Sequence, residues 1–126
     1  MKVPATDTLE RIAAALAWAE ANLDRRITVA VVARRAFYSP FHFHRIVSGL
    51  TGTPLMDHLR RRRLTIAAAA LREGDRPLLE IALDAGFDSQ EAFTRAFKTF
   101  SGVTPGRYRR DPGAGTVVPT PPLDLV

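Results

Sequence analysis

The 126-residue sequence predicts an all-α fold, with two helix-turn-helix units joined by a long central helix and about seven helices in total. Three observations lead to this prediction. A segment of about 25 residues occurs twice at an offset of 50 residues. Residues that favour helix N-termini, together with glycines that end helices, bracket short segments of helical apolar periodicity. No segment alternates between apolar and polar residues as a half-buried strand would.

The segment ahead of the first repeat predicts an amphipathic helix. Leu9, Ile12, Leu16 and Leu23 recur at helical spacing and form one apolar face. With 46% hydrophobic residues the chain can bury a core, and the absence of cysteine excludes disulfides and thiolate metal sites. We expect a single folded domain over residues 7–110.

The first repeat, residues 28–52, predicts two short helices and a turn. Thr28 can cap the first helix and Ser39 the second, and Gly52 ends the second helix. Phe37 stands in the turn, where a glycine is expected. Because a bulky side chain makes a left-handed backbone costly, the sequence predicts that this turn is less tight.

A helix over residues 54–72 is expected to connect the two repeats. Its four consecutive arginines, Arg60–Arg63, point to all sides of a helix. At least one of them, Arg63, must therefore lie against the core or pair with an acid such as Asp57 or Glu73.

The second repeat, residues 77–102, follows the same scheme. Gly86 supplies the turn, Asp88 or Ser89 caps the second helix, and Gly102 ends it. The residues that match at an offset of 50 are Phe37 and Phe87, Ser39 and Ser89, Phe43 and Phe93, Arg45 and Arg95, and Gly52 and Gly102.

Residues 111–126 contain four prolines and two glycines and have no apolar periodicity. This composition predicts a tail or a linker. We expect the segment to be poorly ordered and to bury no face.

The charge is concentrated in two blocks. The chain has a formal net charge of +5, from 18 basic and 13 acidic residues. Residues 25–63 are strongly basic, residues 64–93 are acidic, and residues 94–110 are basic again. Two separated basic blocks favour two contacts with a polyanion. A generally arginine-rich composition would explain the choice of arginine over lysine, but it would not explain the blocks.

A short helix, a tight turn and a second helix in a basic chain form the helix-turn-helix pattern. The most specific motifs are Ser39-Pro-Phe-His-Phe-His-Arg45, Gly52-Thr-Pro-Leu55, Ile81-Ala82, Gly86-Phe87-Asp-Ser89 and Gly102-Val-Thr-Pro105. With these motifs the sequence resembles the DNA-binding domain of the AraC/XylS family of bacterial transcription regulators over about residues 9–110. The resemblance implies two recognition helices that enter successive major-groove segments of double-stranded DNA.

The first repeat resembles a subgroup in which this domain is N-terminal and a GyrI-like effector-binding domain follows. The Ser-Pro-Phe-His-Phe-His-Arg string and the non-glycine turn carry this resemblance. It implies that residues 111–126 are a linker to such a domain; a short tail on a stand-alone regulator is the alternative. RNA polymerase is a further partner that the resemblance implies.

By the same resemblance, six residues occupy base-reading positions: His44, Arg45, Gln90, Glu91, Thr94 and Arg95. Arginine can bond guanine with two hydrogen bonds, glutamine can pair with adenine, glutamate can accept from cytosine, and threonine can contact a thymine methyl group. Glu91 can also serve as a helix cap, or pair with Arg95 at a spacing of four residues. Phe41 is expected to pack, and contact with a thymine methyl group is the alternative.

Contacts with DNA phosphates are expected from basic and polar residues outside these six. The candidates are Arg34, Arg35, Ser48, Arg60, Arg61, Arg62, Lys98, Arg107, Arg109 and Arg110. For each of them a solvated surface position is the alternative.

Other classes of function are weaker. A helical module that docks on RNA polymerase or another protein without reading bases is the alternative to DNA binding. No residues have the spacing of a catalytic triad, a phosphate loop, a cofactor site or a metal site, so an enzyme is not expected. The chain has neither a secretory signal nor a segment long enough to cross a membrane, so we expect a cytoplasmic protein.

Overall fold

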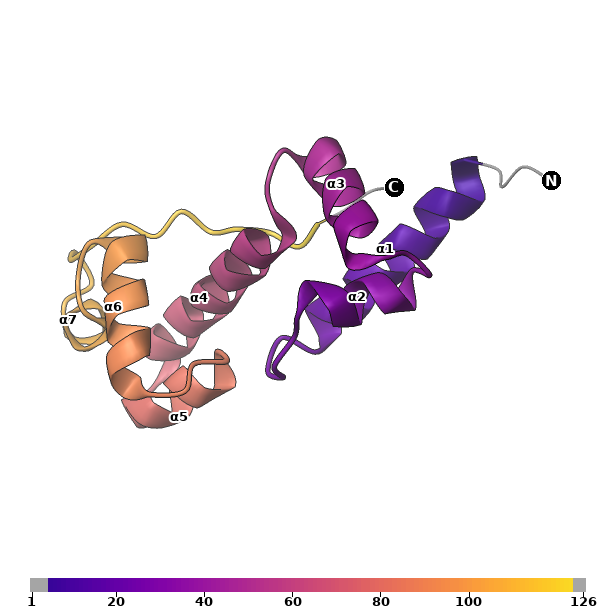
Figure 1. The fold of residues 1–126 in the computed structure, drawn as a ribbon. Coiled ribbons are helices and arrows are strands. Elements are labelled where there is room, and N and C mark those ends of the chain that lie inside the picture. Colours follow the sequence, from indigo (N-terminus) through magenta and orange to yellow (C-terminus); the bar gives the residue numbers. More distant parts are fainter. Residues whose placement is uncertain (1–4, 124–126) are drawn as a thin grey trace. The chain divides into compact units, whose positions relative to one another are not determined.

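The computed structural model describes residues 5–123, and in this range it contains seven α-helices and no strand (Figure 1). The helices are α1 (Ala5–Ala21), α2 (Val29–Arg35), α3 (Pro40–Thr51), α4 (Leu55–Glu73), α5 (Leu78–Asp84), α6 (Gln90–Ser101) and α7 (Pro105–Arg110). The predicted all-α fold is confirmed. The chain divides into two compact units, and the last three residues of the predicted tail, 124–126, lie outside the described residues.

The first unit contains α1, α2, α3 and the first turn and a half of α4. Helix α2 packs against both α1 and α3. Ile12, Val32, Phe43 and Val47 are almost completely buried and form its core. Leu9, on the predicted apolar face ahead of the first repeat, is 40% exposed, and Leu50, which helical spacing places on the same face as Phe43 and Val47, is 51% exposed. Leu9 lies one turn after the start of α1 and Leu50 is the next-to-last residue of α3, so the core does not reach them.

The second unit contains the rest of α4 together with α5, α6 and α7. Small and aliphatic residues of α4 form one wall of its core, and Phe93 and Phe97 of α6 pack against them. The ring of Phe97 lies 5.7 Å from that of Phe93 and 5.2 Å from that of Tyr108, measured between centroids. Alanines at positions 67 and 68 of α4 let the neighbouring helices approach closely enough for these rings to be buried.

The turns before α3 and α6 have the same hydrogen bonds. In the first turn Phe37 N donates to Arg34 O at 3.1 Å and Tyr38 N to Ala33 O at 3.0 Å. In the second turn Gly86 N and Phe87 N make the corresponding bonds, both at 3.0 Å, to Leu83 O and Ala82 O. Phe37 has φ +64° and Gly86 has φ +83°. The prediction of a less tight first turn was therefore wrong, because Phe37 adopts the left-handed backbone.

This geometry also corrects the alignment of the two repeats. Phe37 is equivalent to Gly86, at an offset of 49, and not to Phe87 as the sequence match suggested. One additional residue, Asp88, in the second turn restores the offset of 50 for the helices that follow. The two phenylalanines consequently differ in environment, since Phe37 is 80% exposed whereas Phe87 packs against the core of the second unit.

Arg63 anchors the segment that begins the second unit. Its Nε donates to Leu23 O at 2.8 Å and its Nη2 donates to Arg25 O at 3.0 Å. Burial lowers the pKa of Arg63 below its ordinary value. Arg63 is thus half-buried and hydrogen-bonded within the chain, and its partners are backbone carbonyls rather than the predicted acids Asp57 or Glu73.

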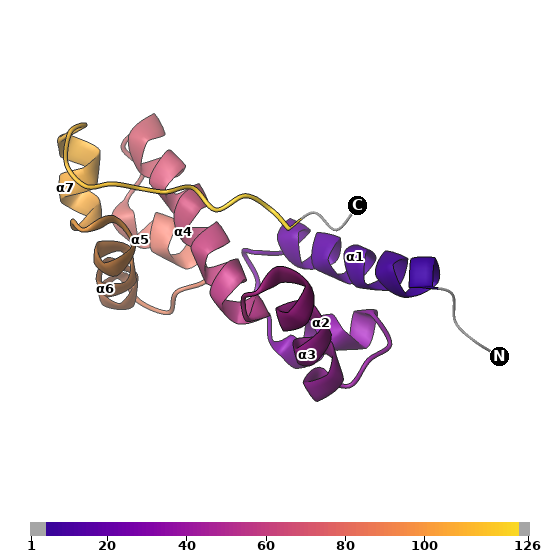
Figure 2. The same ribbon diagram turned by 90° about the horizontal axis from the view of Figure 1, so that it is seen from above.

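Residues 111–120, here called the strap, begin with a turn and a bend over residues 112–115 and then run along α4 within the second unit (Figure 2). Thr116 N donates to Ser101 O at 2.9 Å, and Thr120 N donates to Thr65 Oγ1 at 3.0 Å. Ala114 is buried, with 6% of its surface exposed. The prediction that this stretch buries no face was therefore wrong. A chain without periodicity can still bury single residues where other helices supply hydrogen-bond partners.

Candidate nucleic-acid interface

Helices α3 and α6 begin and end in the same way. Ser39 Oγ accepts from His42 N at 3.2 Å, and Ser89 Oγ accepts from Ala92 N at 3.1 Å. Each helix ends at a glycine in the left-handed conformation, Gly52 and Gly102. Because the cap satisfies an N–H group that the helix itself cannot, the first turn of each helix is held in a defined position.

On α3 the buried side chains decide which residues face solvent. Phe43 and Val47 are buried, which leaves His44 and Arg45 exposed. Phe41 was expected to pack, but it is 72% exposed. The guanidinium carbon of Arg45 lies 5.8 Å from the centroid of the Phe41 ring. Phe41 therefore belongs to the same exposed surface as the two predicted base readers.

On α6 the structure brings all four predicted base readers together. Gln90, Glu91, Thr94 and Arg95 line one hollow of about 750 Å³ at the N-terminal end of the helix, here called the polar hollow. Thr94 is half-buried and the other three are exposed. The remaining lining residues are Leu79, Asp88 and Ser89. Among the described residues no ion pair joins Glu91 to Arg95, so the intrahelical pair that their spacing allows is not formed.

Seven of the ten phosphate candidates are exposed: Arg34, Arg35, Arg60, Arg61, Lys98, Arg107 and Arg110. Arg35 stacks on an aromatic ring, since its guanidinium carbon lies 4.3 Å from the centroid of Trp18. Such stacking leaves the edges of the guanidinium free to donate hydrogen bonds.

The other three candidates are less accessible, because two of them are hydrogen-bonded within the chain and the hydroxyl of the third is buried. Arg62 Nη1 donates to Thr120 O in the strap at 2.8 Å. Arg109 Nε donates to Leu71 O at 3.2 Å, and its Nη2 is buried. The Ser48 hydroxyl oxygen is also buried, so it does not face a ligand in this conformation. Carbonyl partners of this kind leave no trace in the sequence.

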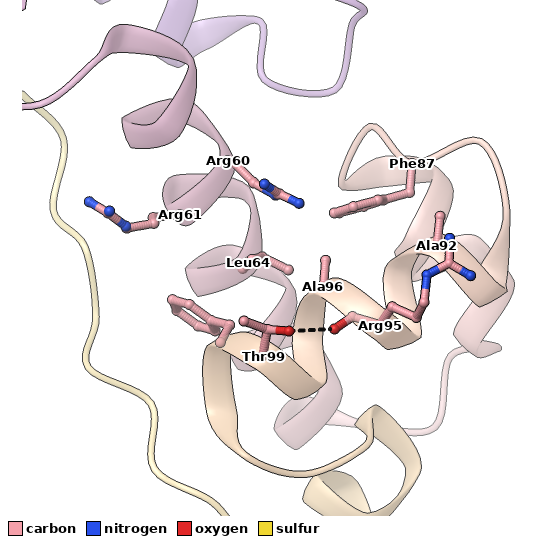
Figure 3. Close-up of a pocket in the computed structure, with 9 residues that line it drawn as sticks. Arg60, Arg61, Leu64, Phe87, Ala92, Arg95, Ala96 and Thr99 are labelled. Atoms are coloured by element: carbon pink, nitrogen blue, oxygen red, sulfur yellow. Dashed lines mark hydrogen bonds between the residues drawn. The ribbon is translucent and has the colours of Figure 1, made fainter.

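The structure contains a second hollow that sequence reasoning missed, here called the arginine hollow. It has a volume of about 480 Å³ and lies between α4 and α6 (Figure 3). Its lining residues are Arg60, Arg61, Leu64, Phe87, Ala92, Arg95, Ala96, Thr99 and Phe100. A cationic rim next to Leu64 could have been read from the basic run of α4, but its pairing with the outer face of α6 depends on the tertiary fold.

No helix in the described range of residues 5–123 is both long enough and apolar enough to cross a membrane.

Comparison with known proteins identifies relatives that match most of this chain. The right origin-binding protein of Escherichia coli K12 is 44% identical over 110 residues, which cover 87% of this chain and 38% of that protein. The transposon Tn10 TetD protein of E. coli is 46% identical over 96 residues, covering 76% of this chain and 70% of the relative. The chain thus spans less than two fifths of the first relative's length.

A solved structure of a DNA-binding domain has the same fold as this chain. The DNA-binding domain of the global transcriptional factor AdpA, determined in complex with a target DNA, matches with a TM-score of 0.75 and 30% identity. The match covers 82% of this chain and 98% of that domain. The family model described as a helix-turn-helix domain matches residues 32–111, which include the helices from α3 to α7 and all but the first three residues of α2. On the motifs, the fold and these matches, the chain belongs to the AraC/XylS family of helix-turn-helix proteins.

Proposed function

We propose that this chain is the DNA-binding part of a sequence-specific transcription regulator, and that α3 and α6 are its two recognition helices. One observation carries the proposal. The fourth, fifth and sixth residues of the two helices have matching roles: a buried phenylalanine, a polar residue and an exposed arginine. These residues are Phe43, His44 and Arg45 in α3, and Phe93, Thr94 and Arg95 in α6. In a helix-turn-helix motif, residues near the start of the recognition helix contact base edges.

The chemistry of the exposed residues suits the major groove. Arg45 and Arg95 can each donate two hydrogen bonds to guanine O6 and N7, a contact worth about 1–3 kcal/mol of discrimination. Gln90 can pair with adenine, Thr94 can contact a thymine methyl group, and Glu91 can accept from cytosine N4. Since the serine caps hold the first turns in place, little backbone entropy is lost on binding, and the entropic cost that remains is the ordering of the exposed side chains themselves.

Sequence-independent affinity would come from the exposed cations. Arg34 and Arg35 lie at the end of α2, Arg60 and Arg61 in α4, and Lys98 in α6. Arg107 and Arg110 extend the set into α7. Each arginine or lysine that neutralises a phosphate releases counterions, so binding should weaken steeply as salt is raised. Arg62, Arg109 and Ser48 are left out because their polar atoms are engaged or buried within the chain.

The relatives support this proposal for the chain as a whole. One is named as an origin-binding protein, and the AdpA domain was determined in complex with a target DNA. The proposal makes the chain a binding protein rather than an enzyme, and places it in the cytoplasm with the DNA. We further propose that one protomer uses both recognition helices, so that its site needs no palindrome. RNA polymerase and a following effector-binding domain remain predictions of the family resemblance.

Selection of bound sequences from a random double-stranded DNA library tests the proposal. We expect one enriched site with two short blocks about one helical turn apart, because a single chain carries two recognition helices. The Arg45→Ala/Arg95→Ala double variant, with the caps and core unchanged, serves as the control and should lose the enrichment while it keeps salt-dependent binding. If the unsubstituted chain enriches no sequence, it does not read bases. That result would favour the alternative, a module that docks on another protein.

A further inference from the structure

The arginine hollow has more positive charge than the polar hollow, and more of its lining residues are apolar. Three of its nine lining residues are arginines and none is acidic. By contrast, the polar hollow holds Asp88 and Glu91 beside a single arginine. Within residues 5–123 the structure shows no ion pair for Arg60, Arg61 or Arg95, so their charges are not compensated there. The arginine hollow is therefore suited to an anion.

The floor of the hollow adds a second requirement. Leu64 is buried, while Phe87, Ala96 and Phe100 are half-buried and keep part of their surface open to the hollow. Arg60 points across this floor toward Phe87 (Figure 3). A phosphate group would satisfy the guanidinium groups but would leave the apolar floor in contact with water. An aromatic carboxylate would cover the floor and place its charge on the arginines, an arrangement that is typical of small-molecule sites.

We propose that the arginine hollow binds an amphipathic aromatic carboxylate and that the bound ligand competes with DNA for Arg95. In Figure 3 the guanidinium group of Arg60 points over the floor, whereas those of Arg61 and Arg95 point away from it. The carboxylate accepts hydrogen bonds from Arg60, and from Arg61 and Arg95 once their side chains rotate toward the hollow, while the aromatic rings lie on Leu64, Phe87 and Phe100. This site goes beyond the proposed function, since it takes a small molecule rather than a nucleic acid.

Arg95 links the site to DNA binding because it lines both hollows. Its guanidinium can donate to a ligand in the arginine hollow or to a base edge on the other side of α6, but not to both in the same geometry. By linkage, a ligand that binds only DNA-free protein weakens DNA binding as its concentration rises above its own dissociation constant. This second half of the inference rests on the proposed function, whereas the binding of the ligand does not.

The binding experiment uses the 126-residue chain without DNA and 2-naphthoate as the probe, with affinity followed by NMR chemical-shift titration. We expect shifts concentrated on the lining residues of α4 and α6. Neutral 2-naphthamide, acetate and inorganic phosphate should each bind at least about fivefold more weakly, because each lacks either the charge or the apolar body. Equal binding of phosphate, or equal binding of the amide, would overturn the proposed ligand class.

Two variants with one positive charge fewer sharpen the result. Arg60→Gln removes a guanidinium from the rim and should weaken 2-naphthoate about fivefold or more. Arg25→Gln removes an exposed arginine of the same unit that does not line the hollow, and should leave the affinity unchanged. Thermal melts of both variants show whether the fold is kept. Equal weakening in the two variants would reduce the site to a general charge effect and refute it.

The competition experiment adds 2-naphthoate to the complex of the chain with its selected DNA site. We expect DNA affinity to fall in proportion to ligand occupancy in the unsubstituted chain, and to fall much less in Arg60→Gln. If 2-naphthoate binds in the titration yet leaves DNA affinity unchanged, the site stands and the competition is refuted. If no DNA site is found at all, the proposed function fails while the titration still decides the ligand site.

Discussion

The two helix-turn-helix motifs reach the same backbone with different residues at the turn. The first turn places Phe37 at a φ of +64°, and the second places Gly86 at +83°. Glycine adopts this conformation without strain, whereas a side chain with a Cβ atom costs roughly 1–2 kcal/mol there. Because the first turn makes the same two hydrogen bonds, the packing of α2 and α3 outweighs the strain at Phe37. The turn geometry is thus imposed by the helices on either side of it, and not by a glycine.

The segments after the recognition helices differ from the turns in that similar residues, a threonine and a serine, make the same hydrogen bonds. Thr51 Oγ1 donates to Thr53 O at 3.0 Å and accepts from Thr53 N at 3.3 Å. Ser101 Oγ makes the same pair of bonds with Val103, at 2.9 and 3.2 Å. A hydroxyl at the last helical position closes both turns. Only in the second unit does a strap add a further bond, from Thr116 N to Ser101 O.

The importance of the glycine in the second turn can be tested by replacing Gly86 with phenylalanine, the residue that occupies the equivalent position in the first turn. In Gly86→Phe, the new Cβ atom would lie 3.2 Å from Arg63 Nε, and Arg63 is held by two carbonyl groups. We expect the free energy of unfolding to fall by about 3 kcal/mol, from backbone strain and from weakened Arg63 bonds. Thermal or urea denaturation measures this loss.

Gly102→Phe is the matched control. It places the same side chain on a similar backbone, φ +90°, but nothing lies within 4 Å of its Cβ atom. It should cost only the backbone term of about 1–2 kcal/mol. Equal losses in the two variants would show that the contact with Arg63 contributes nothing.

The functional equivalence of the two motifs is tested by Arg45→Ala and Arg95→Ala. We expect each to weaken binding to the selected site by about 1–3 kcal/mol and to relax base preference in a different half of the site. The two losses should be similar, because in the described residues Arg95 is not diverted into an ion pair with Glu91. Quantitative gel shifts on the selected and single-base variant sites measure both effects. If specific and non-specific binding fall in equal proportion, neither arginine reads bases.

The contribution of the strap to stability can be measured by removing it. Removal of residues 111–126 exposes the surface under Ala114 and deletes the bonds of Thr116 and Thr120. We expect the free energy of unfolding to fall by about 1–2 kcal/mol, with faster amide hydrogen exchange in α6 than in the intact chain. DNA affinity should stay within a few-fold. A tenfold loss of DNA affinity at unchanged stability would instead assign the segment to the DNA interface.

The smallest change in the free energy of unfolding is expected for Phe37→Gly, which gives the first turn the residue of the second. Phe37→Gly relieves the backbone strain at φ +64° and loses little contact, because Phe37 is 80% exposed. The free energy of unfolding should rise by about 0.5–1 kcal/mol after the extra chain entropy of glycine is subtracted. Phe37→Ala keeps the strain and removes the ring, so its stability should match that of the unsubstituted chain. A loss of stability in Phe37→Gly would show that the exposed ring contributes to the fold.

Much of the fold follows from interactions within a few residues. The serine caps of α3 and α6 bond an N–H three residues away, and Gly52 and Gly102 end these helices through bonds four residues back. The buried faces that carry Phe43 and Phe93 follow from helical periodicity. The outward positions of Arg45 and Arg95 follow in turn, since the opposite face is buried. These features can be read from the order of the residues alone.

The rest was decided by partners that are distant in the sequence. Arg63 bonds a carbonyl 40 residues away, Arg109 one 38 residues away and Arg62 one 58 residues away. Every residue except proline offers the same N–H and every residue the same C=O, so no sequence pattern reveals which carbonyl an arginine will find. The defined path of the strap and the left-handed backbone at Phe37 likewise depend on the helices packed around them. Composition determined that this chain has many cations, and only the tertiary structure decided which of them remain exposed for a ligand.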